Sequence, residues 1–324
     1  MSDFDRQLEE AFGRDAIRRD APLAPLTTLR VGGPAERFLE LRGAAPLRRA
    51  AQLAADAGVA VTVLGGGSNV LVADGGVRGL VVRVPGGDVR AVTPSHLGTG
   101  DPGVIIVRAD AGVTINGLVR WTISHGVAGL EAWAGTPGTV GGAIFGNAHF
   151  RGRLISELLE LVTLVTPSGD IAEVPASGME FGYDYSRLHR TREIVVSADF
   201  RASPGAPDAL RAIARESLSF RKRTQPLASP SAGCIFQNPD PARETLPDAV
   251  PYSAGALVDR AGLKGARQGQ AQVSPVHANF IVNNGGATAR DIRALIERCR
   301  SAVRARFGIT LRDEIVYLGF DPPP

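Results

Sequence analysis

Two glycine-rich turns, about seventy residues apart, are the parts of this sequence best suited by residue type to bind phosphate. The first reads Gly65-Gly66-Gly67 and continues with Ser68 and Asn69. A run of glycines between apolar strands exposes successive backbone N–H groups on a concave surface, which binds phosphate oxygens without a charged side chain. Ser68 and Asn69 add side-chain donors at its rim. The alternative interpretation is a tight hairpin that needs glycine only for its geometry.

The second turn runs from Gly135 through Pro137 and Gly138 to Gly141 and Gly142. The proline fixes its own φ and the glycines carry no Cβ, so a flat ring or a pyrophosphate can approach the backbone closely. A Rossmann dinucleotide site needs the spacing G-x-G-x-x-G between a strand and a helix, with an acidic residue roughly twenty positions later. Neither turn has that spacing. Together they predict a phosphate-bearing cofactor in a fold other than the Rossmann fold.

The histidines and cysteines predict no metal site. None of the five histidines has metal-ligand spacing to another histidine or to a cysteine. These histidines are His96, His125, His149, His189 and His277. The two cysteines, Cys234 and Cys299, are too few for a disulfide framework or a zinc site, which favours a reducing, cytoplasmic location. Cys299 falls on the apolar stripe of an expected helix, so we assign it to the core.

Composition excludes several classes of protein. The chain has 324 residues, enough for two or three domains, with 44% hydrophobic and 21% charged residues, as in a soluble globular protein. A net charge of +3 gives no large cationic field, so we expect no nucleic-acid partner. No run of apolar residues is long enough to span a bilayer, so we expect no membrane insertion. Residues 1–20 are charged and do not resemble a signal peptide.

Hydrophobic periodicity predicts a mixed α+β chain. The expected strands are 28–31, 36–41, 59–64, 70–72, 80–84, 104–108, 158–166, 169–174, 193–201, 309–311 and 315–318. The expected helices are 1–20, one with apolar positions at 47–54 that ends at Gly58, 115–125, 207–223 and a last one that Thr288 N-caps, Asp291 supports through a capping box and Gly308 ends. Residues 94–103 and 238–252 are rich in turn-forming residues and have no periodic pattern.

Eight motifs resemble, in collinear order, those of the UDP-N-acetylenolpyruvoylglucosamine reductase family. They are TTLRVGGPA (27–35), GGGSNVL (65–71), GLEAWAGTPGTVGGA (129–143), NA (147–148), PSAGCIFQNP (230–239), AGLKG (261–265), HANFIVN (277–283) and LRDEI (311–315). The resemblance covers nearly the whole chain from about residue 22. Several ordered motifs are more specific than any one of them.

The resemblance implies a flavoprotein of the vanillyl-alcohol-oxidase fold, with two FAD-binding subdomains at 1–85 and 86–220 and a C-terminal α/β substrate domain at 221–324. It implies NADPH-dependent reduction of UDP-N-acetylenolpyruvoylglucosamine to UDP-N-acetylmuramate for peptidoglycan synthesis. It assigns FAD to Gly65, Gly66, Gly67, Ser68, Asn69, Leu71, Gly135, Thr136, Pro137, Gly138, Thr139, Gly141, Gly142 and Asn147.

The reaction needs a group that protonates C2 of the enolpyruvyl unit and groups that stabilise the enolate formed when hydride adds at C3. The family carries a serine as proton donor where this chain has Cys234. A thiol is the stronger acid, so Cys234 is expected to fill that role. The alternative is a small buried apolar residue. Glu314 matches the family's C-terminal acidic residue, thought to polarise the enol ether, and Arg312 is a candidate cation beside it.

The sequence departs from the family at Asp184, where an arginine normally stabilises the enolate. This change reverses the local charge and puts the catalytic rate in doubt, unless the carboxylate is neutralised or displaced. Arg187 and Arg190 are the candidate substitutes. Gln237 likewise replaces a lysine that is common in the family.

Candidate contacts to the UDP-sugar substrate are Tyr183, Arg221, Gln225, Asn238 and Lys264. Cations and amides suit phosphate oxygens, although basic residues at a helix end can equally be solvated. His277 and Asn279 match a family motif and can be structural hydrogen-bonders.

Two other functions stay open on the residues alone. One is a flavin oxidase of the same fold. The other is a degenerate paralogue that binds FAD or a UDP-sugar without catalysis. Asp184 and Gln237, which depart from the family's residues, favour this second hypothesis. The sequence does not indicate an oligomeric state.

Overall fold

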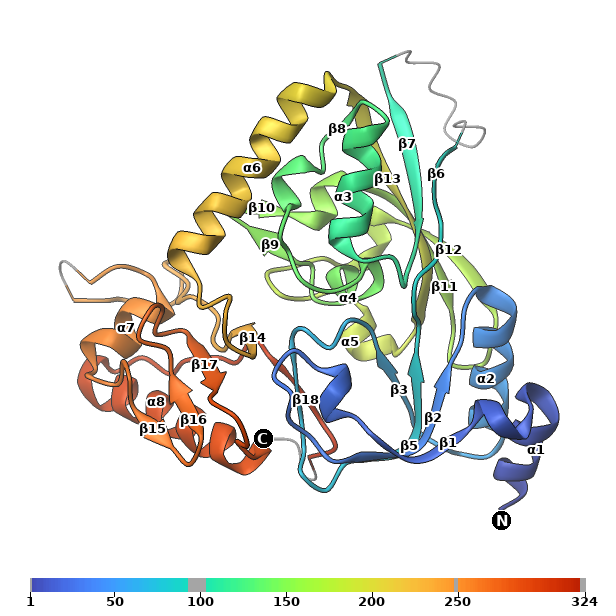
Figure 1. Cartoon of the computed structure of the whole chain (residues 1–324), viewed down its shortest axis with the longest axis horizontal. Coiled ribbons are helices and arrows are strands. Elements are labelled where there is room, and N and C mark those ends of the chain that lie inside the picture. The colour runs from blue at the N-terminus through green and yellow to red at the C-terminus, as the bar shows by residue number, and fades with distance from the viewer. Residues whose placement is uncertain (1, 93–102, 248–249, 321–324) are drawn as a thin grey trace. The chain divides into compact units, whose positions relative to one another are not determined.

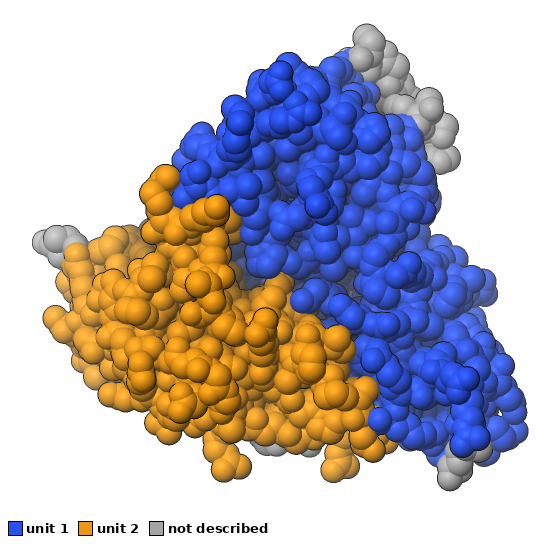
Figure 2. All heavy atoms as spheres, viewed as in Figure 1, with its two compact units in different colours: residues 1–19, 37–66, 79–220 blue, residues 20–36, 67–78, 221–324 orange. Residues whose placement is uncertain are grey.

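The computed structural model describes residues 2–92, 103–247 and 250–320 (Figure 1). The chain divides into two compact units (Figure 2). Unit 1 comprises 1–19, 37–66 and 79–220, and unit 2 comprises 20–36, 67–78 and 221–324. Each unit has a hydrophobic core of its own. The three sequence-based domains, 1–85, 86–220 and 221–324, stay a prediction, and part of each turn-rich segment falls outside the described residues.

Unit 1 contains most of the β-structure. Its strands are β3 (Val61–Leu64), β6 (Val89–Val92), β7 (Ile105–Asp110), β8 (Val127–Ala128), β9 (His149–Phe150), β10 (Arg153–Leu154), β11 (Leu159–Val165), β12 (Ile171–Pro175) and β13 (Ile194–Pro204). Its helices are α1 (Asp3–Phe12), α2 (Ala44–Asp56), α3 (Ile115–Ser124), α4 (Val140–Phe145) and α5 (Leu188–Thr191), with 3₁₀ turns at Arg14–Ala16, Glu131–Trp133, Ile155–Leu158 and Ala176–Met179.

An antiparallel sheet organises unit 1, with the strand order β12-β11-β13-β7-β6 and with β8 paired to β13. Helices α2 and α4 both pack on it. Thr114 N-caps α3 by accepting a hydrogen bond from the Gly117 amide at 3.0 Å. The apolar side chains of α2 and α3 are buried on one face of each helix, as the periodicity predicts.

Unit 2 is built around a four-stranded sheet. Its strands are β4 (Val70–Val72), β14 (Ser231–Cys234), β15 (Arg267–Gln268), β16 (Ala271–Val273), β17 (Phe280–Asn283) and β18 (Val316–Leu318). Its helices are α7 (Ala254–Arg260) and α8 (Ala289–Phe307), with a 3₁₀ turn at Ala24–Leu26. The sheet order is β14-β17-β16-β15, and β18 pairs in parallel with β4.

Four further elements contain residues of both units. They are β1 (Arg18–Pro22), β2 (Pro34–Glu40), β5 (Val77–Arg83) and α6 (Pro207–Thr224). The strands belong to a sheet of order β1-β2-β5-β3, in which β3 and β5 are parallel.

The last long helix confirms its sequence signals. Thr288 and Asp291 form the capping box of α8, and Gly308 ends the helix at φ 72°. Two predicted strands are wrong. At 28–31 the chain makes a turn, with Arg30 at φ 55°, because the Arg30 amide donates back to the Thr27 carbonyl. At 309–311 the apolar residues are buried in the core of unit 2 without pairing into a sheet.

Candidate functional site

The two glycine turns meet in unit 1. A Cβ placed on Gly65 would lie 2.6 Å from Oγ1 of Thr139, and one placed on Gly66 would lie 2.8 Å from Cα of Gly138. Real Cβ atoms do not come that close, so the approach of the two backbones requires glycine at position 66, and a Cβ at Gly65 would displace the Thr139 hydroxyl. Segments about seventy residues apart in sequence thus form one surface, as a shared ligand would need.

Local hydrogen bonds hold the second turn in place. Thr139 N-caps α4, and its hydroxyl accepts from the Gly142 amide at 3.4 Å. The Gly138 carbonyl accepts from the Ile115 amide at 3.1 Å, which ties the turn to the start of α3. Helix α4 itself is absent from the sequence-based expectation, which treats the segment as bare backbone.

The amide groups of the two turns fall into two sets. Those of Gly135 and Gly141 donate to Oδ1 of Asn116 at 2.7 Å and to the Ala111 carbonyl at 2.9 Å. Those of Gly66, Gly138 and Thr139 donate to no protein acceptor within the described part of the chain. Backbone donors are therefore available where the two turns meet, and they fit an anionic, phosphate-bearing group.

The remaining predicted cofactor residues are distributed over both units. Gly67, at φ 63°, accepts on its carbonyl from the Thr28 amide at 3.0 Å, and Leu71 is buried in the core of unit 2. Asn147 is fully buried; its side chain donates to the Gly182 carbonyl at 2.8 Å and accepts from the Ser156 amide at 3.2 Å. These bonds give Asn147 a scaffold role within unit 1. Ser68, Thr136 and Pro137 lie in the turns as the sequence places them.

Unit 2 brings together the two predicted catalytic residues. Cys234 ends strand β14 and is half-buried. The amide of Glu314 donates to the carbonyl of Ile235, the residue after the cysteine, at 2.8 Å. The side chain of Asn69 donates to the Glu314 carbonyl at 3.0 Å, so the end of the first turn reaches the same place.

Asn279 explains why this part of unit 2 is rigid. Its side chain accepts from the Phe236 amide at 2.9 Å and donates to the Phe236 carbonyl at 2.8 Å, while its own carbonyl accepts from the Ile235 amide. A buried side chain that pairs with both backbone groups of another residue fixes that segment. The structural interpretation of Asn279 is therefore favoured.

Arg221 supplies a buried positive charge in unit 2. Only 5% of the residue is exposed, and burial lowers the pKa of its guanidinium to about 10. The charge of Cys234 acts in the opposite direction and raises this pKa. The two groups therefore interact electrostatically, and a cysteine thiolate would be stabilised by this cation.

The other predicted substrate residues of unit 2 already have protein partners. Lys264 forms an ion pair with Asp259 at 3.0 Å, and both side chains are substantially exposed. Asn238 accepts from the Ala254 amide at 3.0 Å, at the start of α7. Gln225 follows α6, where its amide donates to the Arg221 carbonyl.

The charge reversal at Asp184 has a counterpart that sequence reasoning missed. Oδ1 of Asp184 lies 3.1 Å from Nε2 of His149, and the His149 ring packs against Tyr183 with centroids 4.8 Å apart. The arginines proposed as substitutes are engaged elsewhere: Arg187 donates to Glu193 from Nε and Nη2, and Arg190 donates to Glu180. The only signal in the sequence was the charge reversal at Asp184 itself, since a carboxylate at that position needs a donor or a cation nearby.

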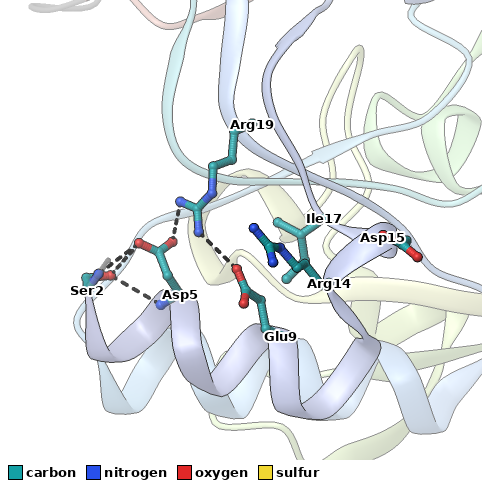
Figure 3. A pocket seen from close by; sticks show the side chains of 7 residues that line it. All are labelled: Ser2, Asp5, Glu9, Arg14, Asp15, Ile17 and Arg19. Atoms are coloured by element: carbon teal, nitrogen blue, oxygen red, sulfur yellow. Dashed lines mark hydrogen bonds and ion pairs between the residues drawn. The ribbon is translucent and has the colours of Figure 1, made fainter.

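A pocket of about 730 Å³ lies beside α1, away from any predicted site residue in sequence (Figure 3). Figure 3 shows Arg19 bridging Asp5 and Glu9, while Ser2 bonds Asp5 at the start of the helix. Burial acts to raise the pKa of Asp5, yet its bonds to Arg37, Ser2 and Arg19 outweigh that and hold the pKa far below its usual range. Asp5, Glu9 and Arg19 of this pocket are therefore paired with one another, and these pairs stabilise the start of the chain.

Comparisons with known proteins define the class. A family model described as FAD binding domain matches residues 35–175, a stretch that includes both glycine turns. Another, described as the C-terminal domain of UDP-N-acetylenolpyruvoylglucosamine reductase, matches residues 225–318. We call the surface where the two turns meet, at Gly65, Gly66, Gly138 and Thr139, the glycine cradle. The fold and this cradle are thus those of an FAD-dependent oxidoreductase.

Whole-chain relatives identify the family. The chain is 41% identical to UDP-N-acetylenolpyruvoylglucosamine reductase of Anaeromyxobacter dehalogenans, over 93% of this chain and 85% of that protein. It is 38% identical to the enzyme of that name from Geobacter metallireducens, over 94% and 95%. The crystal structure of the Thermus caldophilus enzyme matches with a TM-score of 0.74 and 32% identity, over 93% of this chain and 99% of that one. The chain belongs to the UDP-N-acetylenolpyruvoylglucosamine reductase family.

These matches confirm the predicted α+β fold with an FAD-binding domain, and FAD as cofactor. Among the described residues, no helix combines the length and apolar character needed to cross a bilayer.

Proposed function

We propose that this chain reduces the enolpyruvyl ether of UDP-N-acetylenolpyruvoylglucosamine to UDP-N-acetylmuramate, with FAD as redox cofactor and NADPH as electron donor. The observation that carries the proposal is the junction of Cys234 and Glu314 in unit 2. These residues lie eighty positions apart in the sequence. The amide of Glu314 nevertheless donates to the carbonyl of Ile235, the residue that follows Cys234. An acidic thiol and a carboxylate held together are suited to protonate and polarise the same substrate carbon.

The glycine cradle of unit 1 binds the cofactor in this proposal. The N–H groups of Gly66, Gly138 and Thr139, which have no protein acceptor among the described residues, would hold the phosphate-bearing part of FAD, and the absence of side chains at Gly65 and Gly66 would leave room for it. When bound, FAD would supply the hydride chemistry of the reduction, with NADPH as the electron donor. The remaining chemistry belongs to the protein's side chains.

Cys234 donates the proton that C2 requires. The S–H bond breaks, a C–H bond forms at C2, and the electron pair left on sulfur makes a thiolate. The buried guanidinium of Arg221, which interacts with Cys234, stabilises that thiolate. Glu314 polarises the enol ether from the neighbouring segment.

Arg221, Gln225, Asn238 and Lys264, all of unit 2, are the contacts we propose for the UDP diphosphate, because cations and amides suit phosphate oxygens. Tyr183 of unit 1, 42% exposed, offers a ring for the substrate to pack on. A cytoplasmic location belongs to the proposal and is supported by the two cysteines, neither of which forms a disulfide.

Stopped-flow absorbance of the flavin tests the proposal. The FAD-loaded protein is reduced anaerobically with NADPH and mixed with the enolpyruvyl UDP-sugar. We expect rapid reoxidation with formation of UDP-N-acetylmuramate. Reduced flavin that ignores this substrate but reacts quickly with oxygen would instead support an oxidase, and reactivity with neither would support a non-catalytic paralogue.

A further inference from the structure

The chain around Glu314 pairs with the chain just after the predicted proton donor, and the pairing is short. The Glu314 amide donates to the Ile235 carbonyl at 2.8 Å, and the Gln237 amide donates to the Arg312 carbonyl at 2.8 Å. An isolated antiparallel bridge lies between these two bonds. A pairing of this length is only marginally stable by itself, so further contacts must hold the Glu314 segment in place.

Side chains on either side of Glu314 alternate between the core of unit 2 and the opposite face. Leu311 and Ile315 are buried in that core, whereas Arg312 is exposed. Asp313 falls in step with the two buried residues, and successive side chains of an extended segment point to opposite faces. The side chain of Asp313 is therefore directed toward the core, and that of Glu314 away from it.

Arg300 of α8 holds this segment from the core side. Its Nη2 lies 2.6 Å from both carboxylate oxygens of Asp313, and its Nε donates to the Leu311 carbonyl at 3.2 Å. Its Nη1 donates to Glu297 on the same helix. A planar guanidinium that makes several bonds at once fixes the direction of its partners as well as their distance. One side chain thus ties α8 to two points of the segment just before Glu314.

The half-buried position of this ion pair makes its geometry well defined. The side chains of Arg300 and Asp313 are 22% and 19% exposed. Burial raises the pKa of Asp313, while Arg300 and the Tyr317 hydroxyl, which donates to the same carboxylate at 3.2 Å, act to lower it. A carboxylate directed toward a core is costly without such partners. Buried ion pairs add little net stability, so the pair is better explained by the geometry that it fixes.

The carbonyl of Glu314 has a second anchor. Asn69 donates to it from its side chain at 3.0 Å, and the Asn69 carbonyl accepts from the Val316 amide at 2.9 Å. The amide of Glu314, its carbonyl and the side chain before it are therefore all bonded within unit 2. The carboxylate of Glu314 takes its direction from a backbone that has little freedom left.

We propose that Arg300, acting through Asp313, is a positioning residue that sets the direction in which the Glu314 carboxylate meets the enolpyruvyl substrate. This inference rests on the proposed function. In this role Arg300 acts through the backbone and not by contact with the substrate. A misplacement of about 1 Å can slow a chemical step roughly a hundredfold. The effect belongs to the half-reaction that consumes the UDP-sugar, in which Glu314 acts, and not to flavin reduction by NADPH.

Measuring the two half-reactions separately tests the inference. In FAD-loaded Arg300→Met we expect reoxidation of the NADPH-reduced flavin by the enolpyruvyl UDP-sugar to slow about ten- to a hundredfold in stopped-flow absorbance, with flavin reduction by NADPH unchanged. Arg300→Lys keeps the charge and can remake part of the bonding, so it should recover part of the rate. Asp313→Asn, a milder change of the same size, should slow the same step by a smaller factor.

Arg108→Met provides the matched control. Arg108 donates to Asp199 in unit 1 from Nε and Nη2 at 2.6 Å each, and the two side chains are 23% and 9% exposed. This variant also loses a largely buried, bidentate ion pair, but one without a bond to the Glu314 segment. We expect both half-reactions to remain unchanged in it.

Hydrogen exchange in the apoprotein gives a readout that needs no catalysis. The amides of Glu314 and Gln237 report the pairing that Arg300 is proposed to hold. In Arg300→Met they should exchange about tenfold faster than in the unmodified protein, because the segment opens locally more often. In Arg108→Met their exchange should not change.

Three results would each overturn the inference. They are unchanged exchange at these two amides in Arg300→Met, equal slowing of both half-reactions, and normal reoxidation in the folded Arg300 and Asp313 variants. If the unmodified enzyme does not reduce the UDP-sugar, the proposed function fails. Exchange at the two amides then still decides whether Arg300 holds the Glu314 segment.

Discussion

Replacing Gly66 by alanine should weaken FAD binding while leaving most of the fold intact. The new Cβ would lie 2.8 Å from Cα of Gly138 and 3.3 Å from its carbonyl carbon. Both are backbone atoms, which cannot turn aside as a flexible side chain can. The second turn must therefore move by several tenths of an ångström, away from the position in which its amides converge with those of the first.

The size of the effect follows from that overlap. Forcing extra atoms into a well-packed region typically costs about 1–3 kcal/mol. If the turns separate to relieve the overlap, bringing them back together to bind FAD costs the same free energy. The binding free energy is weakened by that amount, and the dissociation constant for FAD rises roughly 5- to 150-fold. Because the strain is relaxed in the apoprotein, the apoprotein's melting temperature should fall by only a few degrees.

Quenching of FAD fluorescence on titration with apoprotein measures the affinity directly. Gly75→Ala is the matched control, since a Cβ there meets no heavy atom within 4 Å and the residue has no positive φ. An FAD affinity in Gly66→Ala within twofold of that of Gly75→Ala would refute the reasoning, because the meeting of the turns would then have no part in cofactor binding.

Variants at three further positions test the chemistry and the electrostatics of unit 2. Cys234→Ala should abolish turnover but not flavin reduction by NADPH, whereas Cys234→Ser should retain turnover, as stopped-flow absorbance would show. Arg221→Met should raise the free energy of unfolding by about 1–3 kcal/mol, because a buried cation with its pKa lowered to about 10 is replaced by an apolar side chain, while calorimetry should show weaker binding of the UDP-sugar. Burial, assisted by the charge of Lys264, lowers the pKa of His277, so stability should be lost as pH falls below the unfolded value of about 6.5; His277→Gln should reduce that slope by up to about 1.4 kcal/mol per pH unit in urea titrations.

Each of these expectations has a contrary result. A Cys234→Ala enzyme that turns over normally would exclude the thiol as proton donor. A lower melting temperature in Arg221→Met would show that its buried contacts outweigh its desolvation. If the free energy of unfolding falls equally steeply with decreasing pH in the unmodified protein and in His277→Gln, a group other than His277 takes up the proton.

Local signals in the sequence predicted the elements that depend on local chemistry. The capping box at Thr288 and the terminal Gly308 fixed both ends of α8, since those bonds lie within a few residues of the helix. The same reasoning failed at 309–311, where alternating apolar residues reflect burial in a core and not pairing in a sheet. Periodicity reports which side chains are buried and does not identify the partner.

The part of the candidate site formed by the two glycine turns could be predicted from the sequence, because each turn is a recognisable motif. The two glycine turns were expected to share a ligand, and their meeting at Gly66 and Gly138 agrees with that expectation. The pairing of His149 with Asp184 depends on a tertiary contact between residues 35 positions apart, so no local pattern announces it. The clue was the charge reversal itself, because an unexplained buried carboxylate requires a partner somewhere in the fold.

The discontinuity of unit 2 has a consequence for how the protein is made. Its core includes Leu29 and Leu71, and strand β4 pairs with β18 near the other end of the chain. Asn69 and Glu314, joined by a hydrogen bond, are separated by 245 residues. On the ribosome the early segments of unit 2 must therefore wait for nearly the entire chain before their partners emerge, and closing so large a loop is slow. The nascent chain exposes those apolar segments throughout that interval, which makes it a natural client for chaperones during synthesis.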